Sequence, residues 1–309
     1  MNVNILPTNY QEIKDYIDGN STIGHKIWGA IPHEDGYIFR VYAPNADEMD
    51  IKGDFTGWQN ERLIKNDEYG YFYGFFKAKL GDYYKYIVVK IVEDSYVFKD
   101  EEFIKRRSKN FDKPLNIYEL HIGSFMRFSG QVNFLDIVDS LISHVKEMGY
   151  THVEIMPVTE YPFYPSWGYQ STGFFAISHR YGTADDFKKF VDLLHQNGIG
   201  VILDVVAVHY ASDFYALDHF DGTAMYESQY MDLKYSEWGS NNFDYSKGHV
   251  RSFMKSSMAY LIEEFHLDGI RIDAVSYMVF YNGNKDRGVH HDNIFFIKNL
   301  NETLTDLFP

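Results

Sequence analysis

The fold is decided by the stretch Leu267-Asp268-Gly269-Ile270-Arg271-Ile272-Asp273-Ala274-Val275. Its centre alternates with a period of two, so a β-strand here directs Ile270 and Ile272 to one face. Arg271 and Asp273 share the opposite face. A basic and an acidic side chain are therefore expected next to each other on one strand.

The charged pair has two explanations, which depend on how the strand is packed. A helical spacing of apolar residues over 253–265 precedes it, and a strand that follows a helix so closely usually lies in a parallel sheet. Such strands are buried on both faces, so the pair is either a structural ion pair or a functional one. In the functional alternative, Asp273 is a nucleophile that Arg271 keeps ionised.

The composition limits the class of partner. Hydrophobic residues make up 45% of the 309 residues, which is enough for sizeable cores, and the length suggests two domains. The formal net charge is −15, from 29 Lys and Arg against 44 Asp and Glu. This charge argues against nucleic acid or an anionic membrane as a partner. We expect a neutral or cationic ligand.

No targeting or membrane segment is predicted from the sequence. Residues 1–20 lack the basic and apolar regions of a secretory signal, and no apolar run approaches the ~20 residues of a membrane helix. The lack of cysteine fits a reducing compartment, so we expect a cytoplasmic protein. Aromatic residues reach 18%, which fits either an aromatic-rich core or rings that stack on sugars.

The amino-terminal part is predicted to be rich in β-strands. Residues 1–30 form a lead, with a helix over 10–17 and then a loop. The period then changes to two, and short strands without helices between them indicate a small β-sandwich over 31–95. Its strands are expected at 37–42, 49–53, 71–76 and 83–92, with turns at 54–58 and 80–82. A polar, charged linker is expected over 96–114.

The second part, 115–309, alternates strands with helices. Strands are predicted at 116–120, 151–158, 199–208 and 267–275, and helices at 134–148, 185–196, 253–265 and 294–307. Repeated β/α units with right-handed parallel connections close most simply into an eight-stranded TIM-type barrel. We count about four of the eight units. The expected fold is therefore a β-sandwich followed by an α/β part, an incomplete β/α barrel.

Polar residues stand where these strands end, which is where barrels of this type place their active sites. Asp204 interrupts an apolar strand, where a buried carboxylate costs several kcal/mol unless a partner offsets it. His209 follows in the loop at the rim, and the loop after the second strand carries Trp167-Gly168-Tyr169. Sugar hydroxyls need acceptors such as Asp and donors such as His or Arg. Taken singly, His209 also fits an ordinary rim histidine, and the aromatic loop fits simple packing.

These residues carry a resemblance to a known family. The run from Asp204 to His209, followed by Gly269-Ile270-Arg271-Ile272-Asp273, resembles the first two signature regions of glycoside hydrolase family 13, the α-amylase family. Four further stretches are similar to glycogen branching enzymes in particular: 157–160, 166–170, 181–187 and 243–246. Between Asp204 and His209 those enzymes more often carry Trp, Pro and Gly. This sequence departs from that pattern but keeps the polar residues, so the departure bears only on which acceptor is preferred. Residues 40–46 and 53–58 look like a carbohydrate-binding module of family 48.

The resemblance implies a retaining mechanism on α-1,4-linked glucan, with glycogen or amylose-like chains as the partner. Asp273 would attack the anomeric carbon and form a covalent glycosyl enzyme. Arg271 would keep Asp273 ionised, and Asp204, His209 and Tyr169 would bind the donor sugar. In a branching enzyme the acceptor is then the 6-hydroxyl of another glucan. Neither a metal nor an organic cofactor is implied, and we expect His290-His291 to lie in a loop instead of forming a ligand pair.

One catalytic group of the family is not found in the sequence. The family places its acid/base Glu at the end of the fifth strand, and the chain stops at Pro309 before such a strand. No motif assigns that role to Glu119, Glu154 or Glu160. We therefore expect an amino-terminal part whose partner would be the missing carboxyl-terminal half. This part alone should have negligible branching activity and should aggregate through its unpaired strand edges.

Two other functions remain open from the sequence. One is a debranching or amylase-type hydrolase of the same family. The other is a non-catalytic glucan-binding protein in which the β-sandwich binds the glucan through Trp58 and Lys85. Trp58 could equally pack under its own turn.

Overall fold

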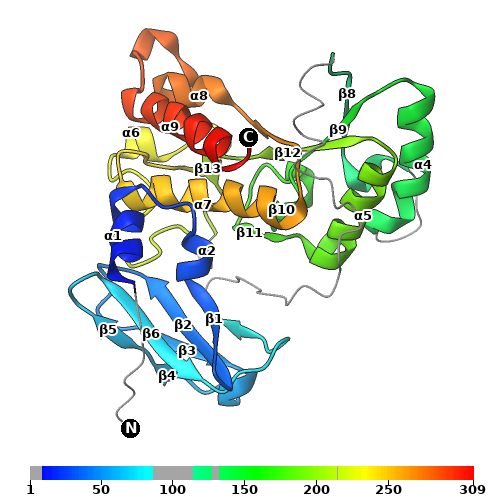
Figure 1. Cartoon of the computed structure of the whole chain (residues 1–309). Helices are drawn as coiled ribbons and strands as arrows, with labels where there is room; N and C mark the ends of the chain where they lie inside the picture. Colours follow the sequence, from blue (N-terminus) through cyan, green and yellow to red (C-terminus); the bar gives the residue numbers. More distant parts are fainter. Residues whose placement is uncertain (1–8, 86–113, 127–131, 214) are drawn as a thin grey trace.

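Residues 9–85, 114–126, 132–213 and 215–309 are described by the computed structural model of the chain. Figure 1 shows a β-sandwich, coloured blue to cyan, below a larger part built from parallel strands and helices. The two helices of the amino-terminal lead lie between them. The expected order, a sandwich followed by an incomplete β/α barrel, is confirmed.

The sandwich consists of two small antiparallel sheets. The strand order of the first is β1-β2-β6-β5 and that of the second is β4-β3-β7. The strands are β1 (Gly29–His33), β2 (Gly36–Tyr42), β3 (Asp50–Gly53), β4 (Glu61–Arg62), β5 (Ile64–Asn66), β6 (Tyr71–Phe76) and β7 (Tyr84–Lys85). Phe39, Ile51 and Phe72 are among the buried residues of a core that both sheets share.

Three of the predicted sandwich strands are confirmed, namely those at 37–42, 49–53 and 71–76. The strands β1, β4 and β5 were missed, because they are short edge strands and β1 contains Pro32, which sequence patterns penalise. The strand expected over 83–92 is described only as far as Lys85. Its remainder lies outside the described residues, and so does the linker predicted over 96–114 except for Pro114.

The amino-terminal lead joins the two parts. Helix α1 (Tyr10–Asp18) begins after Asn9, whose side chain caps it, as the helical pattern predicted. The prediction of a loop after α1 is partly wrong, because Gly24–Ile27 form helix α2 and strand β1 starts at Gly29. Both segments contact helix α7 (Gly248–Phe265): Ser252 Oγ accepts from Ser21 N at 3.2 Å, and Ser256 Oγ accepts from Gly24 N at 2.8 Å.

The β/α part is centred on one parallel sheet with the strand order β15-β12-β9-β8. The strands are β8 (Ile117–Leu120), β9 (His152–Ile155), β12 (Gly200–Val205) and β15 (Gly269–Ile272). The helices are α4 (Phe134–Glu147), α5 (Ala184–Gln196), α7 and α9 (His291–Leu307). All four predicted strand and helix pairs are present, and the order along the sheet follows the order along the chain. Four parallel strands in this order form an incomplete barrel.

Four details of the sequence prediction are wrong. The third strand ends at Val205 instead of Val208, because the chain leaves the sheet there. His209 lies in a separate short strand, β13 (His209–Tyr210), that pairs with β14 (Asn241–Asn242), and it is buried instead of lying in a rim loop. Strand β15 is not buried on both faces, because it forms an edge of the sheet and its residues are half-buried. His291 is the first residue of helix α9 and His290 is its N-cap, so the pair does not lie within a loop.

Between the sheet strands, two long excursions carry the remaining elements. They are β10 (Thr159–Glu160), β11 (Gly173–Ile177) and α6 (Met231–Lys234). Helix α8 (Val275–Val279) follows β15, the last of the sheet strands. Within the described ranges, none of the helices has the length and apolar character needed to cross a membrane.

Candidate active site

Arg271 joins carboxylates from two neighbouring strands. In the parallel pairing of β12 with β15, Asp204 lies directly opposite Arg271. The guanidinium Nη1 of Arg271 donates to Asp204 Oδ2 and also to Asp273 Oδ1, the latter at 2.8 Å. On β9, Glu154 Oε1 lies 4.0 Å from Arg271 Nε. One cation therefore faces three carboxylates at the carboxyl ends of adjacent strands.

Asp204 is the buried member of this group. Its Oδ2 accepts a hydrogen bond from the Tyr169 hydroxyl at 2.7 Å, and burial raises the pKa of its carboxyl to about 6. Its second oxygen, Oδ1, is buried and has no hydrogen-bond partner among the described residues. An acceptor oxygen without a donor is suited to a hydroxyl of a bound ligand.

Asp273 is the accessible member. Its side chain is 25% exposed, and it stands at the end of β15, just before helix α8. The next residue, Ala274, has left-handed backbone angles (φ 49°, ψ 39°), which are costly for a residue with a Cβ atom. The sharp turn at Ala274 leaves the Asp273 carboxylate at the surface of the site and held by Arg271.

His209 lies close to this group, although no hydrogen bond joins them. Its Nδ1 contacts Ser240 Oγ at 2.9 Å, and its ring lies against the Trp238 indole, with centroids 5.1 Å apart. Burial lowers the pKa of His209 to about 4, while the charge of Asp273 acts in the opposite direction. The imidazole is therefore neutral at pH 7 and can donate from only one nitrogen.

The aromatic loop lies beside Tyr169. Trp167 and Gly168 both have positive φ, and a Cβ atom at Gly168 would lie 2.2 Å from the Pro157 carbonyl oxygen, so only glycine fits there. Trp167 is 57% exposed, and Phe163 and Tyr164 are also exposed. The loop therefore presents aromatic rings to solvent instead of burying all of them.

The structure brings four of the five predicted residues into one contact network, namely Tyr169, Asp204, Arg271 and Asp273, and it places His209 within electrostatic reach of Asp273. The sequence reading did not identify Glu154 or Trp238 as part of this group. Glu154 interrupts an apolar strand as Asp204 does, and this pattern could have identified it. No local pattern marks Trp238.

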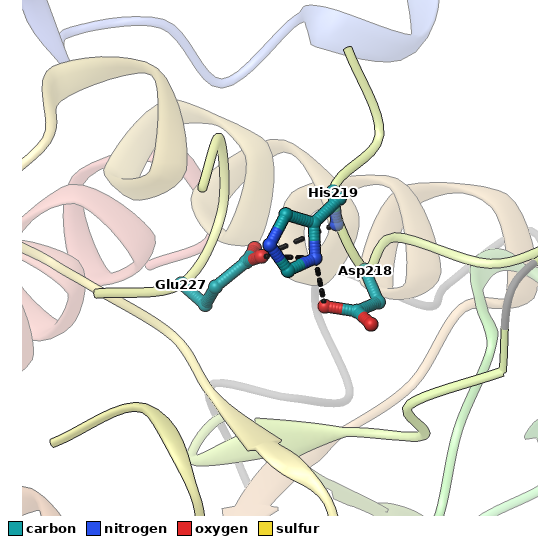
Figure 2. Close-up of side chains that lie close together, drawn as sticks. All are labelled: Asp218, His219 and Glu227. Atoms are coloured by element: carbon teal, nitrogen blue, oxygen red, sulfur yellow. Dashed lines mark hydrogen bonds and ion pairs between the residues drawn. The ribbon is translucent and has the colours of Figure 1, made fainter. Parts of the chain in front are cut away.

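A second group of acidic residues lies apart from these, and Figure 2 shows its members Asp218, His219 and Glu227. Three such side chains could hold a metal ion. However, the ammonium of Lys234 already lies 2.9 Å from Asp218 Oδ1, 3.3 Å from His219 Nδ1 and 3.5 Å from Glu227 Oε1. Glu227 also accepts from the Tyr210 hydroxyl at 2.6 Å. Because a lysine fills the cation position, we interpret this cluster as an internal ion-pair network and not as a metal site.

Comparisons with known protein families match two segments of the chain. Residues 27–98 match carbohydrate-binding module 48, described as the isoamylase N-terminal domain, and residues 130–238 match the α-amylase catalytic domain. Among solved structures, a putative α-amylase from Salmonella typhimurium superposes with a TM-score of 0.67 at 21% identity, covering 89% of this chain and 47% of that one. This likeness concerns the fold.

Curated relatives match nearly the whole chain. A 1,4-alpha-glucan branching enzyme GlgB from Fusobacterium nucleatum is 38% identical over 92% of this chain and 52% of its own length. GlgB from Halothermothrix orenii is 35% identical over 98% of this chain and 56% of its own length. The chain thus spans about half the length of the curated relatives it matches.

Proposed function

Because the chain belongs to the α-amylase family, as a relative of its 1,4-alpha-glucan branching enzymes, we propose that it forms the donor side of a glucan branching site. The observation that carries the proposal is the Asp273 carboxylate at the end of β15, held by Arg271 beside Asp204 and Tyr169. The reaction would cleave an α-1,4 link and transfer the chain to a 6-hydroxyl, giving an α-1,6 branch.

Asp273 is the proposed nucleophile. One of its carboxylate oxygens forms a bond to the anomeric carbon while the bond from that carbon to the 4-oxygen breaks, and the leaving oxygen takes a proton from a carboxylic acid. The 6-hydroxyl of an acceptor glucan then displaces Asp273 and returns a proton to the carboxylate that the acid became in the first step. Configuration is retained because two displacements occur at the same carbon. Arg271 orients Asp273 through the 2.8 Å hydrogen bond.

The remaining residues are proposed to bind the donor sugar. The unpartnered Oδ1 of Asp204 offers an acceptor for a hydroxyl, the Tyr169 ring offers an apolar face, and the neutral imidazole of His209 offers one donor. The net charge of Arg271 with Asp204, Asp273 and Glu154 is negative. This charge would stabilise the positive charge that develops on the sugar ring in an oxocarbenium-like transition state.

The nucleophile is tested with a substrate that needs no acid catalyst. In a 5-fluoro-α-maltosyl fluoride the leaving group is fluoride, which departs without protonation, so a glycosyl enzyme can accumulate even where acid catalysis is absent. We expect mass spectrometry to find one added fluoromaltosyl group on the peptide that contains Asp273. Asp273→Asn should remove the adduct, whereas Asp232→Asn, at an exposed carboxylate of helix α6, should not. An adduct on another carboxylate would contradict the assignment.

Transfer and hydrolysis are separated by the acceptor. Incubation of the chain with α-maltosyl fluoride as donor and amylose as acceptor, followed by proton NMR, would report α-1,6 links if the acceptor is a glucan hydroxyl and free maltose alone if it is water. The second outcome would favour an amylase-type or debranching hydrolase of the same family over a branching enzyme.

Glucan binding without catalysis is a second candidate, favoured by the surface of the sandwich. Trp58 donates its indole N–H to Asp54 Oδ1 at 2.9 Å, yet the side chain remains 44% exposed on the module matched at 27–98. The side chain of Lys85 lies outside the described residues. Glycogen binding that persists in Asp273→Asn and is lost in Trp58→Ala would assign binding to the sandwich.

A further inference from the structure

The turn from Ser236 to Ser240 contacts His209 through the Ser240 hydroxyl and the Trp238 indole. Ser240 Oγ lies 2.9 Å from His209 Nδ1 and 2.6 Å from Ser236 Oγ. The Trp238 ring, at the tip of the turn, covers the His209 ring and lies 4.6 Å from the Tyr277 ring, which belongs to helix α8 after Asp273. His209 is therefore held by a segment that lies about 30 residues away in the sequence.

The direction of each hydrogen bond in this turn follows from counting donors. A hydroxyl group has one proton to donate and two lone pairs to accept. Ser236 Oγ accepts from the backbone N–H of Trp238 at 3.2 Å and from that of Ser240 at 3.3 Å. Both lone pairs are thereby used, so the Ser236 proton must go to Ser240 Oγ. Within the described part of the chain, Ser236 Oγ has no other acceptor in contact.

The second step fixes the proton on the histidine. Ser240 Oγ accepts from Ser236, and Ser240 is fully buried, so its own proton needs an acceptor; among the described residues His209 Nδ1 is the one in contact. Nδ1 must then be the unprotonated nitrogen of a neutral ring, and the ring proton lies on Nε2. The lowered pKa of His209 agrees with a neutral ring.

We propose that Ser236 and Ser240 form a hydroxyl relay that fixes His209 as the Nε2–H tautomer, so that its only donor is directed away from the turn toward a bound ligand. Ser236, Trp238 and Ser240 are positioning residues, since they act through His209. If the proposed function holds, the ligand group is an oxygen acceptor of the donor sugar. The same turn is joined to the aromatic loop, because Gln170 Nε2 donates to the Trp238 carbonyl at 3.2 Å.

The relay is tested in the full chain without any glucan. The protein is labelled with 15N at histidine, and the imidazole nitrogens are recorded at pH 7, with the signals of His209 assigned by their loss in His209→Gln. We expect one tautomer in the wild type, with an unprotonated Nδ1 that accepts a hydrogen bond and a protonated Nε2. In Ser240→Ala the Nδ1 signal should move and a mixture of tautomers should appear, whereas Ser240→Thr keeps a hydroxyl and should restore the wild-type signals.

A matched control contacts the same turn from another segment of the chain. Ser212 Oγ donates to the Gly239 carbonyl at 3.2 Å, so Ser212→Ala removes a hydroxyl that contacts this turn without touching the relay. It should leave both His209 nitrogens unchanged. The relay is overturned if the wild type carries its proton on Nδ1 or shows a mixture, or if Ser240→Ala leaves both nitrogens where they were.

A second readout separates the relay from the proposed function. Maltohexaose binding, measured by calorimetry, should weaken about fivefold in Ser240→Ala, a loss on the order of one hydrogen bond, and should not change in Ser212→Ala. If the NMR result is as expected and the wild type does not bind maltohexaose, the relay stands and the glucan assignment fails. If the wild type binds and Ser240→Ala binds equally well, the ligand role of His209 is wrong.

Discussion

Asp204 and Arg271 lie directly opposite each other in the parallel pairing of β12 with β15, and the Arg271 guanidinium donates to the Asp204 carboxylate. The Asp204 side chain is fully buried, whereas that of Arg271 is 39% exposed. The pair therefore joins a buried acceptor to a cation that reaches the surface and also holds Asp273. The stability of the strand pair and the chemistry of the site depend on the same guanidinium.

Arg271→Met should destabilise the chain by about 2 to 3 kcal/mol, because it leaves the Asp204 carboxylate buried without its cation. The cost is below that of a fully buried pair because Arg271 is partly exposed. Urea unfolding at pH 7 measures it, and adding Asp204→Asn should recover part of the loss in a double-mutant cycle. Arg287→Met, which breaks an exposed ion pair with Asp232, should cost well under about 1 kcal/mol. Equal effects of the two arginine substitutions would contradict the prediction.

Asp204→Asn should change how stability depends on pH. Burial raises the pKa of Asp204 to about 6, so between pH 4 and 6 the folded chain binds more protons than the unfolded chain. This contribution is present in acid and is lost as the pH rises through about 6. The free energy of unfolding of the wild type, minus that of Asp204→Asn, should therefore fall by about 2 to 3 kcal/mol from pH 4 to pH 7. A difference that is constant over this range would show that the carboxyl titrates normally.

His209→Gln should produce the opposite trend. Burial lowers the pKa of His209 to about 4, so between pH 6.5 and 4 the unfolded chain binds more protons than the folded chain. The contribution is present above pH 6.5 and is lost as the pH falls through about 4. The stability of the wild type relative to His209→Gln should therefore decrease on acidification by about 2 to 3 kcal/mol. The effects of Asp204 and His209 on the pH dependence of stability have opposite signs, so they offset each other in the wild type. Each effect is therefore measured in its own single variant.

Lys234→Met should convert the acidic cluster into a metal-binding site. The Lys234 side chain is 5% exposed and that of Glu227 is fully buried, so removing the ammonium should cost about 3 kcal/mol. One imidazole and two carboxylates are suitable ligands for Zn²⁺. We expect zinc to raise the melting temperature of Lys234→Met and to leave the wild type unchanged. As a control, Lys14→Met removes an exposed ion pair and should show neither effect. Stabilisation of the wild type by zinc would mean that Lys234 does not fill the cation position.

Much of the fold could be predicted from periodicity. The period-two segments and the helices between them gave the two parts, all four parallel strands and the position of Asp204, Arg271 and Asp273 at strand ends. The register could not be predicted in this way, because the pairing of Asp204 with Arg271 joins residues 67 positions apart. The burial of His209 was missed for the same reason, since it depends on pairing with β14 and on contact with Trp238. Such contacts leave no local pattern in the sequence.

The edges of the parallel sheet should make the chain associate with itself. Strands β8 and β15 are the outer members of the described sheet, and Ile117 on β8 is 39% exposed. An apolar groove also opens along β15, lined by Ile270, Leu300 and Phe308 among others. Unpaired backbone groups beside exposed apolar side chains favour pairing with another strand, and a second copy of the chain offers the same edge.

Sedimentation velocity over a concentration series checks this expectation. Ile117→Lys places a charge on the β8 edge and should reduce association, because a buried lysine opposes strand pairing. Ile64→Lys alters a similarly exposed isoleucine, 49% exposed, on strand β5 of the sandwich and should leave association unchanged. A wild-type chain that remains a protease-resistant monomer at every concentration would show that these edges are protected. If both substitutions reduced association equally, self-association would depend on exposed apolar side chains in general and not on the β8 edge.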